Sequence, residues 1–198
     1  MAGTTPMTAF IWSANLLGWP VIHLVTASII LRLPLQSFSR DSFLYRSRSW
    51  EQGGEFYRKR LAIHRWKAFL PDGAPWVGGF AKKQLAHRDR DYIGRYLLET
   101  RRAEFAHWCM LLCLPIFFLW NPLWACVVMT AYAAVANVPC ILAQRYNRHV
   151  LARLLNKMKE RSQSGSVDSR DFNARLTQHG TIHRTRTERE GDQANHAP

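Results

Sequence analysis

The sequence predicts an all-α integral membrane protein with three transmembrane helices, a cytoplasmic interfacial amphipathic helix and a disordered C-terminal tail. Three uncharged apolar blocks, strongly basic segments between and after them, and a polar C-terminal stretch without periodicity lead to this prediction. The composition alone would mislead, because 27 Lys and Arg against 14 Asp and Glu in 198 residues would usually suggest a small nucleic-acid-binding domain.

The first apolar block covers residues 9–31 and contains no charged side chain. At ~1.5 Å per residue it crosses a ~30 Å hydrocarbon core as a helix. No Lys or Arg precedes Arg32, and the block is longer than the apolar part of a signal peptide. We therefore expect the mature protein to retain this helix.

Two further blocks, predicted as membrane helices over residues 103–120 and 123–143, are separated by the dipeptide Asn121-Pro122. A connection this short predicts a helical hairpin. Its first arm reaches spanning length only if the helix begins near residue 103, which brings Glu104 and His107 into the interfacial zone.

The distribution of Lys and Arg predicts the orientation. Residues 1–31 and 106–144 contain none, whereas residues 32–105 contain sixteen and residues 145–198 contain eleven. The positive-inside rule then places both basic segments in the cytoplasm and the N-terminus outside. We expect a multi-pass protein of the cell membrane with a cytoplasmic C-terminus.

A basic amphipathic stretch follows Gly53-Gly54 and is predicted as one helix over residues 54–70. Wound as a helix, it gathers apolar side chains such as Trp66 and Phe69 on one side and basic side chains such as Arg60 and Arg65 on much of the rest. Such a helix lies in the interface of a membrane with anionic lipids, although the same pattern also fits a helix packed on protein.

Residues 1–161 are predicted to form one membrane domain, and residues 162–198 a disordered cytoplasmic tail, because they have few apolar residues. The tail's basic side chains are spread out and lack interleaved aromatic residues, so we expect no nucleic-acid partner. Four cysteines in the second and third apolar blocks have no ligand spacing, so we expect no metal.

Polar side chains at membrane depth are costly and are therefore candidates for function. In the first block Asn15 and His23 lie on one helical stripe that must face protein or substrate, and a histidine there is also explained by an interhelical hydrogen bond. In the third block a second stripe combines Asn137, Gln144 and Arg148, with Arg145 beside it.

The segment at residues 99–108 is the richest in chemistry. Glu104 and His107 share a sector of their helix, and Glu99 is placed to pair with Arg102. A carboxylate beside an imidazole is what a general base for deprotonating an alcohol requires, whereas ordinary surface ion pairs are the alternative.

Four ordered motifs resemble the glycosyl-4,4'-diaponeurosporenoate acyltransferase family of staphyloxanthin-type carotenoid biosynthesis. They are HRWKAFLPDG at 64–73, ETRRAEFAHW at 99–108, NP at 121–122 and ANVPCILAQRYNR at 136–148. The resemblance covers roughly residues 10–160. It implies transfer of a fatty acyl group to a sugar hydroxyl of a glycosylated carotenoid, with membrane lipid around the protein, acyl-CoA or a similar acyl donor as co-substrate, and no bound cofactor.

With this reaction, we expect His107 to act as the general base and Glu104 to orient it. Donor phosphates or glycolipid would be held by four arginines, Arg101, Arg102, Arg145 and Arg148. Asn137 and Gln144 would position the sugar or stabilise the oxyanion, and Glu99, His23 and Asn15 are further candidates for substrate binding. A non-enzymatic membrane assembly or lipid-binding protein is the alternative.

Overall fold

The computed structural model describes residues 6–70 and 89–194, with side chains as far as Gln163. The described part of the chain is helical and contains no strand. The chain divides into two compact units, residues 1–153 and 154–198. All contacts described below lie within the first unit.

Three helical segments are long and apolar enough to cross a membrane, namely Ala9–Arg32, Arg90–Leu119 and Leu123–Gln163. Many of their large apolar side chains point away from the protein, as Leu16, Leu123 and Val135 do, each at least 75% exposed. An outward-facing apolar surface of this extent is stable in lipid. The predicted three-span membrane protein is thus confirmed at the level of its helices.

Helix α1 (Pro6–Arg32) carries the first span, and α4 (Arg90–Leu112) begins at Asp89, whose side chain accepts a hydrogen bond from the Tyr92 backbone N–H at 2.7 Å. This N-cap places the start of the helix well before residue 103, where the predicted membrane span begins. The α-helix also ends earlier than predicted and continues as the 3₁₀ helix η5 (Leu114–Leu119). Pro115 explains the change, because proline has no N–H for an α-helical hydrogen bond.

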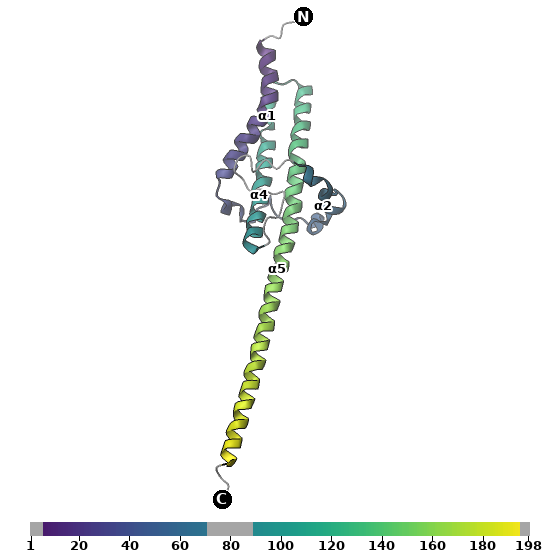
Figure 1. Ribbon diagram of the computed structural model, residues 1–198. Helices are drawn as coiled ribbons and strands as arrows, with labels where there is room; N and C mark the ends of the chain where they lie inside the picture. The colour runs from purple at the N-terminus through teal and green to yellow at the C-terminus, as the bar shows by residue number, and fades with distance from the viewer. Residues whose placement is uncertain (1–5, 71–88, 195–198) are drawn as a thin grey trace. The chain divides into compact units, whose positions relative to one another are not determined.

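Helix α5 (Leu123–Ala194) starts directly after Pro122, so α4 and α5 form the predicted hairpin (Figure 1). Near this turn α1 packs against both arms. The buried Trp19 ring stacks on Phe117 of η5 at 4.8 Å and approaches Tyr132 of α5 at 5.5 Å. Gly18 permits this contact, because a Cβ there would lie 2.9 Å from the Phe117 ring.

The segment between α1 and α4 contains η1 (Leu35–Phe38), η2 (Ser49–Gly54), α2 (Glu55–Lys59), α3 (Ile63–Trp66) and η3 (Lys67–Phe69). The single helix predicted over residues 54–70 is therefore wrong. The break falls at Ala62, whose φ of +47° is incompatible with a continuing right-handed helix.

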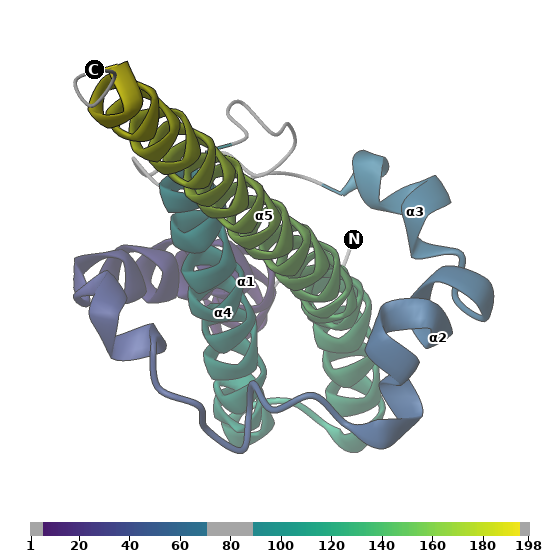
Figure 2. The same ribbon diagram turned by 90° about the horizontal axis from the view of Figure 1, so that it is seen from below.

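The apolar residues of α2 and α3 pack against α5. Tyr57 and Ile63 are fully buried together with Ala143 and Tyr146, and Figure 2 shows α2 and α3 beside α5, away from α1. Phe69, in η3, is 85% exposed instead.

The tail also differs from its prediction. The backbone of α5 is helical to Ala194, where the polar composition of residues 162–198 predicted disorder; residues 195–198 lie outside the described part. Low apolar content argues against a packed core but does not forbid a helix, and this stretch has no proline before Pro198 to end one.

Candidate functional site

Charged side chains of α4 and α5 meet inside the protein. Glu104 of α4 is fully buried, and its two carboxylate oxygens accept hydrogen bonds from Arg145 Nε at 2.8 Å and from an Arg148 terminal nitrogen at 2.5 Å. Arg145 and Arg148 lie one turn apart on α5, so both reach the same carboxylate. Glu104 therefore joins the two arms of the hairpin.

A second buried carboxylate, Glu51, comes from η2 and lies on the other side of Arg145. It accepts a hydrogen bond from an Arg145 terminal nitrogen at 2.6 Å and one from the Tyr57 hydroxyl at 2.5 Å. The Arg48 backbone N–H donates to it at 2.7 Å, and His149 Nε2 lies 3.3 Å away. We call Glu51, Glu104, Arg145 and Arg148 the charged cluster.

The charged cluster balances two carboxylates with two guanidinium groups. Burial alone would raise the pKa of Glu51, but hydrogen bonds from Tyr57 and Arg48 and the positive charge of Arg145 lower it to about 2. The pKa of Tyr57 is raised by burial and by its bond to Glu51. Glu51 is therefore a carboxylate and Tyr57 a neutral phenol at neutral pH.

Tyr45 packs at the edge of the charged cluster. Its ring lies 5.5 Å from the Arg101 guanidinium carbon and 5.9 Å from that of Arg148. Burial and the nearby charge of Glu104 raise the pKa of Tyr45 to about 12. It is thus a neutral hydrogen-bonding group, not a base.

The imidazole of His107 meets α5 one turn further along α4. Its Nδ1 lies 3.0 Å from Asn137 Oδ1, and Asn137 is fully buried. The Asn137 amide nitrogen donates to the Ala133 carbonyl at 3.0 Å, so Oδ1 is the acceptor and the neutral His107 ring carries its proton on Nδ1. Nε2 is then the basic nitrogen.

This geometry changes the role predicted for Glu104. The structure pairs His107 Nδ1 with Asn137, and gives the Glu104 oxygens to Arg145 and Arg148, with Trp108 Nε1 at 3.5 Å. A buried carboxylate is stabilised by positively charged, hydrogen-bonded partners, which the two arginines supply. Asn137 holds the His107 ring at Nδ1.

The remaining arginines of the predicted set also have protein partners. Arg102 donates to both oxygens of Glu99 at 2.7 and 2.8 Å, which confirms the predicted pair. Arg101 donates to the carbonyl oxygens of Phe38 and Ser39 and to the Asp41 carboxylate. It therefore fastens the turn after η1 to α4.

Three further predicted residues are not members of the charged cluster. The Asn15 side chain exchanges hydrogen bonds of 2.8 Å with Asn121, at the α4–α5 turn. The ring of His23 bonds the Trp19 carbonyl of its own helix at 2.8 Å. Gln144 Oε1 is buried and has no hydrogen-bond partner within the described residues.

The sequence did not predict Glu51, Tyr57 or Tyr45 as site residues. All three lie in the irregular segment between α1 and α4, where no helical periodicity relates a residue to the membrane helices. A weak signal for Glu51 existed, since an acidic residue in a basic loop beside Gly53-Gly54 suggests a specific partner.

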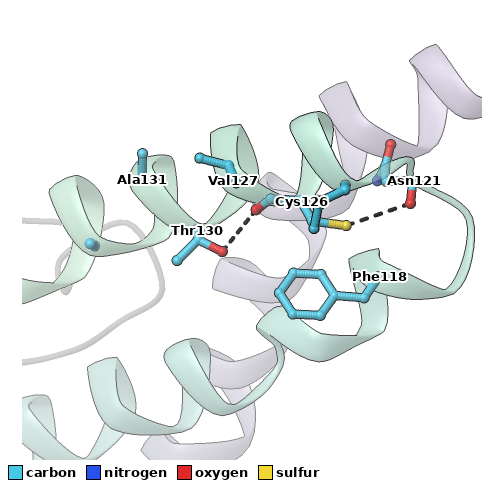
Figure 3. Close-up of a pocket in the computed structure, with 8 residues that line it drawn as sticks. Phe118, Asn121, Cys126, Val127, Thr130 and Ala131 are labelled. Atoms are coloured by element: carbon cyan, nitrogen blue, oxygen red, sulfur yellow. Dashed lines mark hydrogen bonds between the residues drawn. The ribbon is translucent and has the colours of Figure 1, made fainter.

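An open groove of about 680 Å³ lies near the α4–α5 turn, distant along α5 from the charged cluster. Figure 3 shows the Phe118 ring below Cys126 and Thr130 of α5. The groove is lined by Phe118, Asn121, Leu123, Cys126, Val127, Thr130, Ala131 and Ala134.

Comparison with known proteins decides the family. The family model for glycosyl-4,4'-diaponeurosporenoate acyltransferase matches residues 41–157, the stretch that contains the charged cluster and the His107–Asn137 pair. The chain belongs to the glycosyl-4,4'-diaponeurosporenoate acyltransferase family. As a member of that family it is an acyltransferase, and the non-enzymatic alternative is set aside.

Relatives with this name occur in Staphylococcus aureus strains RF122 and USA300. Each is 32% identical to this acyltransferase-family chain over 157 residues, which cover 79% of the chain and 93% of the relative. No solved structure shows a significant match.

Proposed function

We propose that the protein transfers a fatty acyl group to a sugar hydroxyl of a glycosylated carotenoid at the cytoplasmic face of the membrane. The observation that carries the proposal is the His107–Asn137 pair, in which a buried amide 3.0 Å away fixes the imidazole. The family name supports a glycosylated carotenoid as the acceptor and an acyl group as the group transferred, and the basic loops support the orientation.

His107 Nε2 would take the proton of the sugar hydroxyl as the hydroxyl oxygen attacks the acyl carbonyl carbon. The new carbon–oxygen bond forms as a tetrahedral oxyanion. When this intermediate collapses, the carbon–sulfur bond of a thioester donor such as acyl-CoA breaks, and the imidazolium returns its proton to the departing thiolate. The products are the ester and the free thiol.

Asn137 contributes orientation without charge. A carboxylate in its place would stabilise the imidazolium and fix the ring, whereas an amide oxygen fixes the ring and tautomer alone. In this arrangement Asn137 holds the ring so that Nε2 can accept a proton.

Gln144 offers a place for the sugar. Its buried Oε1 has no donor within the described residues, which is a costly arrangement that a hydrogen bond would relieve. Gln144 lies seven residues from Asn137, so the two side chains share a side of α5. A sugar hydroxyl that donates to Gln144 Oε1 would sit beside His107.

The charged cluster has a positioning role in this proposal. Arg145 and Arg148 are already paired with Glu51 and Glu104. These ion pairs fix the position of α4 along the axis of α5 near His107. Donor phosphates would instead meet exposed basic side chains of the segment at residues 55–69, including Arg60 and Arg65. Its exposed Phe69 also supports a position at the membrane interface.

Purified protein in lipid vesicles, supplied with a glucosylated carotenoid acid and palmitoyl-CoA, tests the function. We expect an ester whose mass is that of the glucosylated carotenoid acid plus palmitic acid minus water, detected by mass spectrometry. One molecule of free CoA should appear for each molecule of ester. CoA release without ester would mean hydrolysis. Absence of ester with acyl-CoA, acyl carrier protein and phospholipid donors alike would contradict the proposal.

A further inference from the structure

The groove near the α4–α5 turn lies on the same stripe of α5 as the residues of the site. Its α5 residues recur at helical spacing from Leu123 to Ala134, and Asn137 follows Ala134 by three residues. At 100° per residue, Asn137, Arg145 and Arg148 continue this stripe. Asn137 therefore lies about one helical turn beyond Ala134, the last groove residue along α5.

The lining of the groove presents carbon rather than polar atoms. Thr130 donates its hydroxyl to the Cys126 carbonyl at 2.8 Å, and the Cys126 thiol points to the Asn121 carbonyl at 3.5 Å (Figure 3). The Asn121 amide donates to Asn15 and Phe117. With these polar groups satisfied inside the protein, the groove suits a hydrocarbon and not a sugar or phosphate.

The sizes of the side chains that line the groove favour binding of a long linear hydrocarbon chain. Ala131 and Ala134 leave space on α5, while the Phe118 ring forms the opposite wall. From Asn137 to Leu123 is fourteen residues, or ~21 Å at ~1.5 Å per residue. A chain attached to a sugar at His107 would cover this distance within the ~30 Å hydrocarbon core.

We propose that this groove binds the apolar isoprenoid chain of the acceptor, with the sugar at His107 and the chain running toward Asn121. This inference rests on the proposed function, since the position of His107 in the reaction defines where the sugar lies. The acceptor is favoured over the donor, because the donor's thioester and phosphates approach from the cytoplasmic end, opposite to the groove.

Photocrosslinking tests the groove without requiring turnover. The probe is a long-chain alkyl glucoside with a diazirine at the end of the chain, added to the full-length protein in phosphatidylglycerol vesicles. We expect label on the peptide covering residues 123–134. Ala131→Phe and Ala134→Phe should lower it about fivefold or more by filling the groove, whereas Val135→Phe, on an exposed neighbouring face of α5, should not.

The same variants then separate chain binding from catalysis. With the long-chain acceptor, we expect Ala134→Phe to raise KM about tenfold, while kcat/KM for a short alkyl glucoside stays within about twofold of wild type. Label spread equally over α1 and α5, or unchanged label in both groove variants, would each overturn the proposal. Correct label with no ester would instead contradict the proposed function alone.

Discussion

Glu104 and Arg148 form a buried ion pair, with side chains 0% and 9% exposed. Removing one partner leaves the other charge buried and poorly compensated, so we expect Glu104→Gln to destabilise the protein by ~3–5 kcal/mol. The double variant Glu104→Gln with Arg148→Met should lose less than the sum of its single variants. Thermal unfolding in detergent micelles measures each difference.

The matched control for this cycle is Glu55→Gln, which breaks the solvent-exposed ion pair with Arg58. We expect no measurable change in its unfolding midpoint, because exposed pairs add little to stability. Additive effects of the Glu104 and Arg148 variants would contradict a direct interaction between them.

Glu51 makes stability depend on pH at the acid end. Its pKa is about 2 in the folded protein against an ordinary value of 4.5, so the unfolded chain binds a proton first as the pH falls. The stabilisation is present above pH 4.5 and is lost as the pH falls toward 2. The variant Glu51→Gln lacks this stabilisation at every pH.

Unfolding midpoints at pH 6 and pH 3 check this prediction. We expect the gap between wild type and Glu51→Gln to narrow at pH 3, and Asp91→Asn, at an exposed carboxylate, to keep the acid dependence of wild type. A gap that is equal at both pH values would mean that the Glu51 charge contributes nothing.

At the scale of single residues, helical periodicity predicted the site residues on α4 and α5. It failed for the site residues in the segment between α1 and α4. Asn137, Gln144 and Arg148 share a helical stripe with Arg145 beside it, so their common orientation follows from the sequence. Which carboxylate each arginine chooses does not, because the longitudinal register of α4 against α5 is set by packing. The contact of Glu51 with Arg145 could not be predicted either, because Glu51 lies in the irregular segment between α1 and α4, which has no helical periodicity.

At the scale of elements, η2 and α2 are fixed against α5 by an unusual turn. Gln52, Gly53 and Gly54 have φ values of +48°, +61° and +97° in succession. This left-handed run turns the chain so that Glu51 and Tyr57 both face Arg145. The sequence signalled a break at Gly53-Gly54 but not its direction.

Gly54→Ala and Gly53→Ala form a matched pair for this turn. Both add a Cβ at positive φ, which costs ~1–2 kcal/mol, but at Gly54 the new atom would also lie 2.8 Å from His149 Cβ, whereas Gly53 has open space. We expect Gly54→Ala to be the more destabilising by ~1–3 kcal/mol. Equal unfolding midpoints would show that this segment does not dock on α5 at His149.

At the scale of the whole molecule, the charge distribution predicts the orientation in the membrane. The positive-inside rule predicts an external N-terminus and a cytoplasmic segment between α1 and α4. Maleimide that cannot cross membranes should therefore label Met7→Cys but not Ser47→Cys in intact cells, and both in lysed cells. Both substituted side chains are exposed in the structure, and labelling of Ser47→Cys from outside would reverse the topology.

Sequence patterns predicted the spans better than the segments between them. Uncharged length is a direct property of the chain, so the three spans follow from it. The segment at residues 54–70 failed as one helix because its basic and apolar periodicity fits both lipid and protein, and burial of Tyr57 and Ile63 on α5 decided the outcome.

The central claim, that His107 is the base for acyl transfer, is tested most directly by the rate of ester formation by His107→Gln in vesicles. We expect kcat to fall about 10²-fold or more, while the unfolding midpoint stays near that of wild type and His64→Gln, at an exposed histidine of α3, keeps full activity. A folded His107→Gln variant that forms ester at the wild-type rate would contradict the claim.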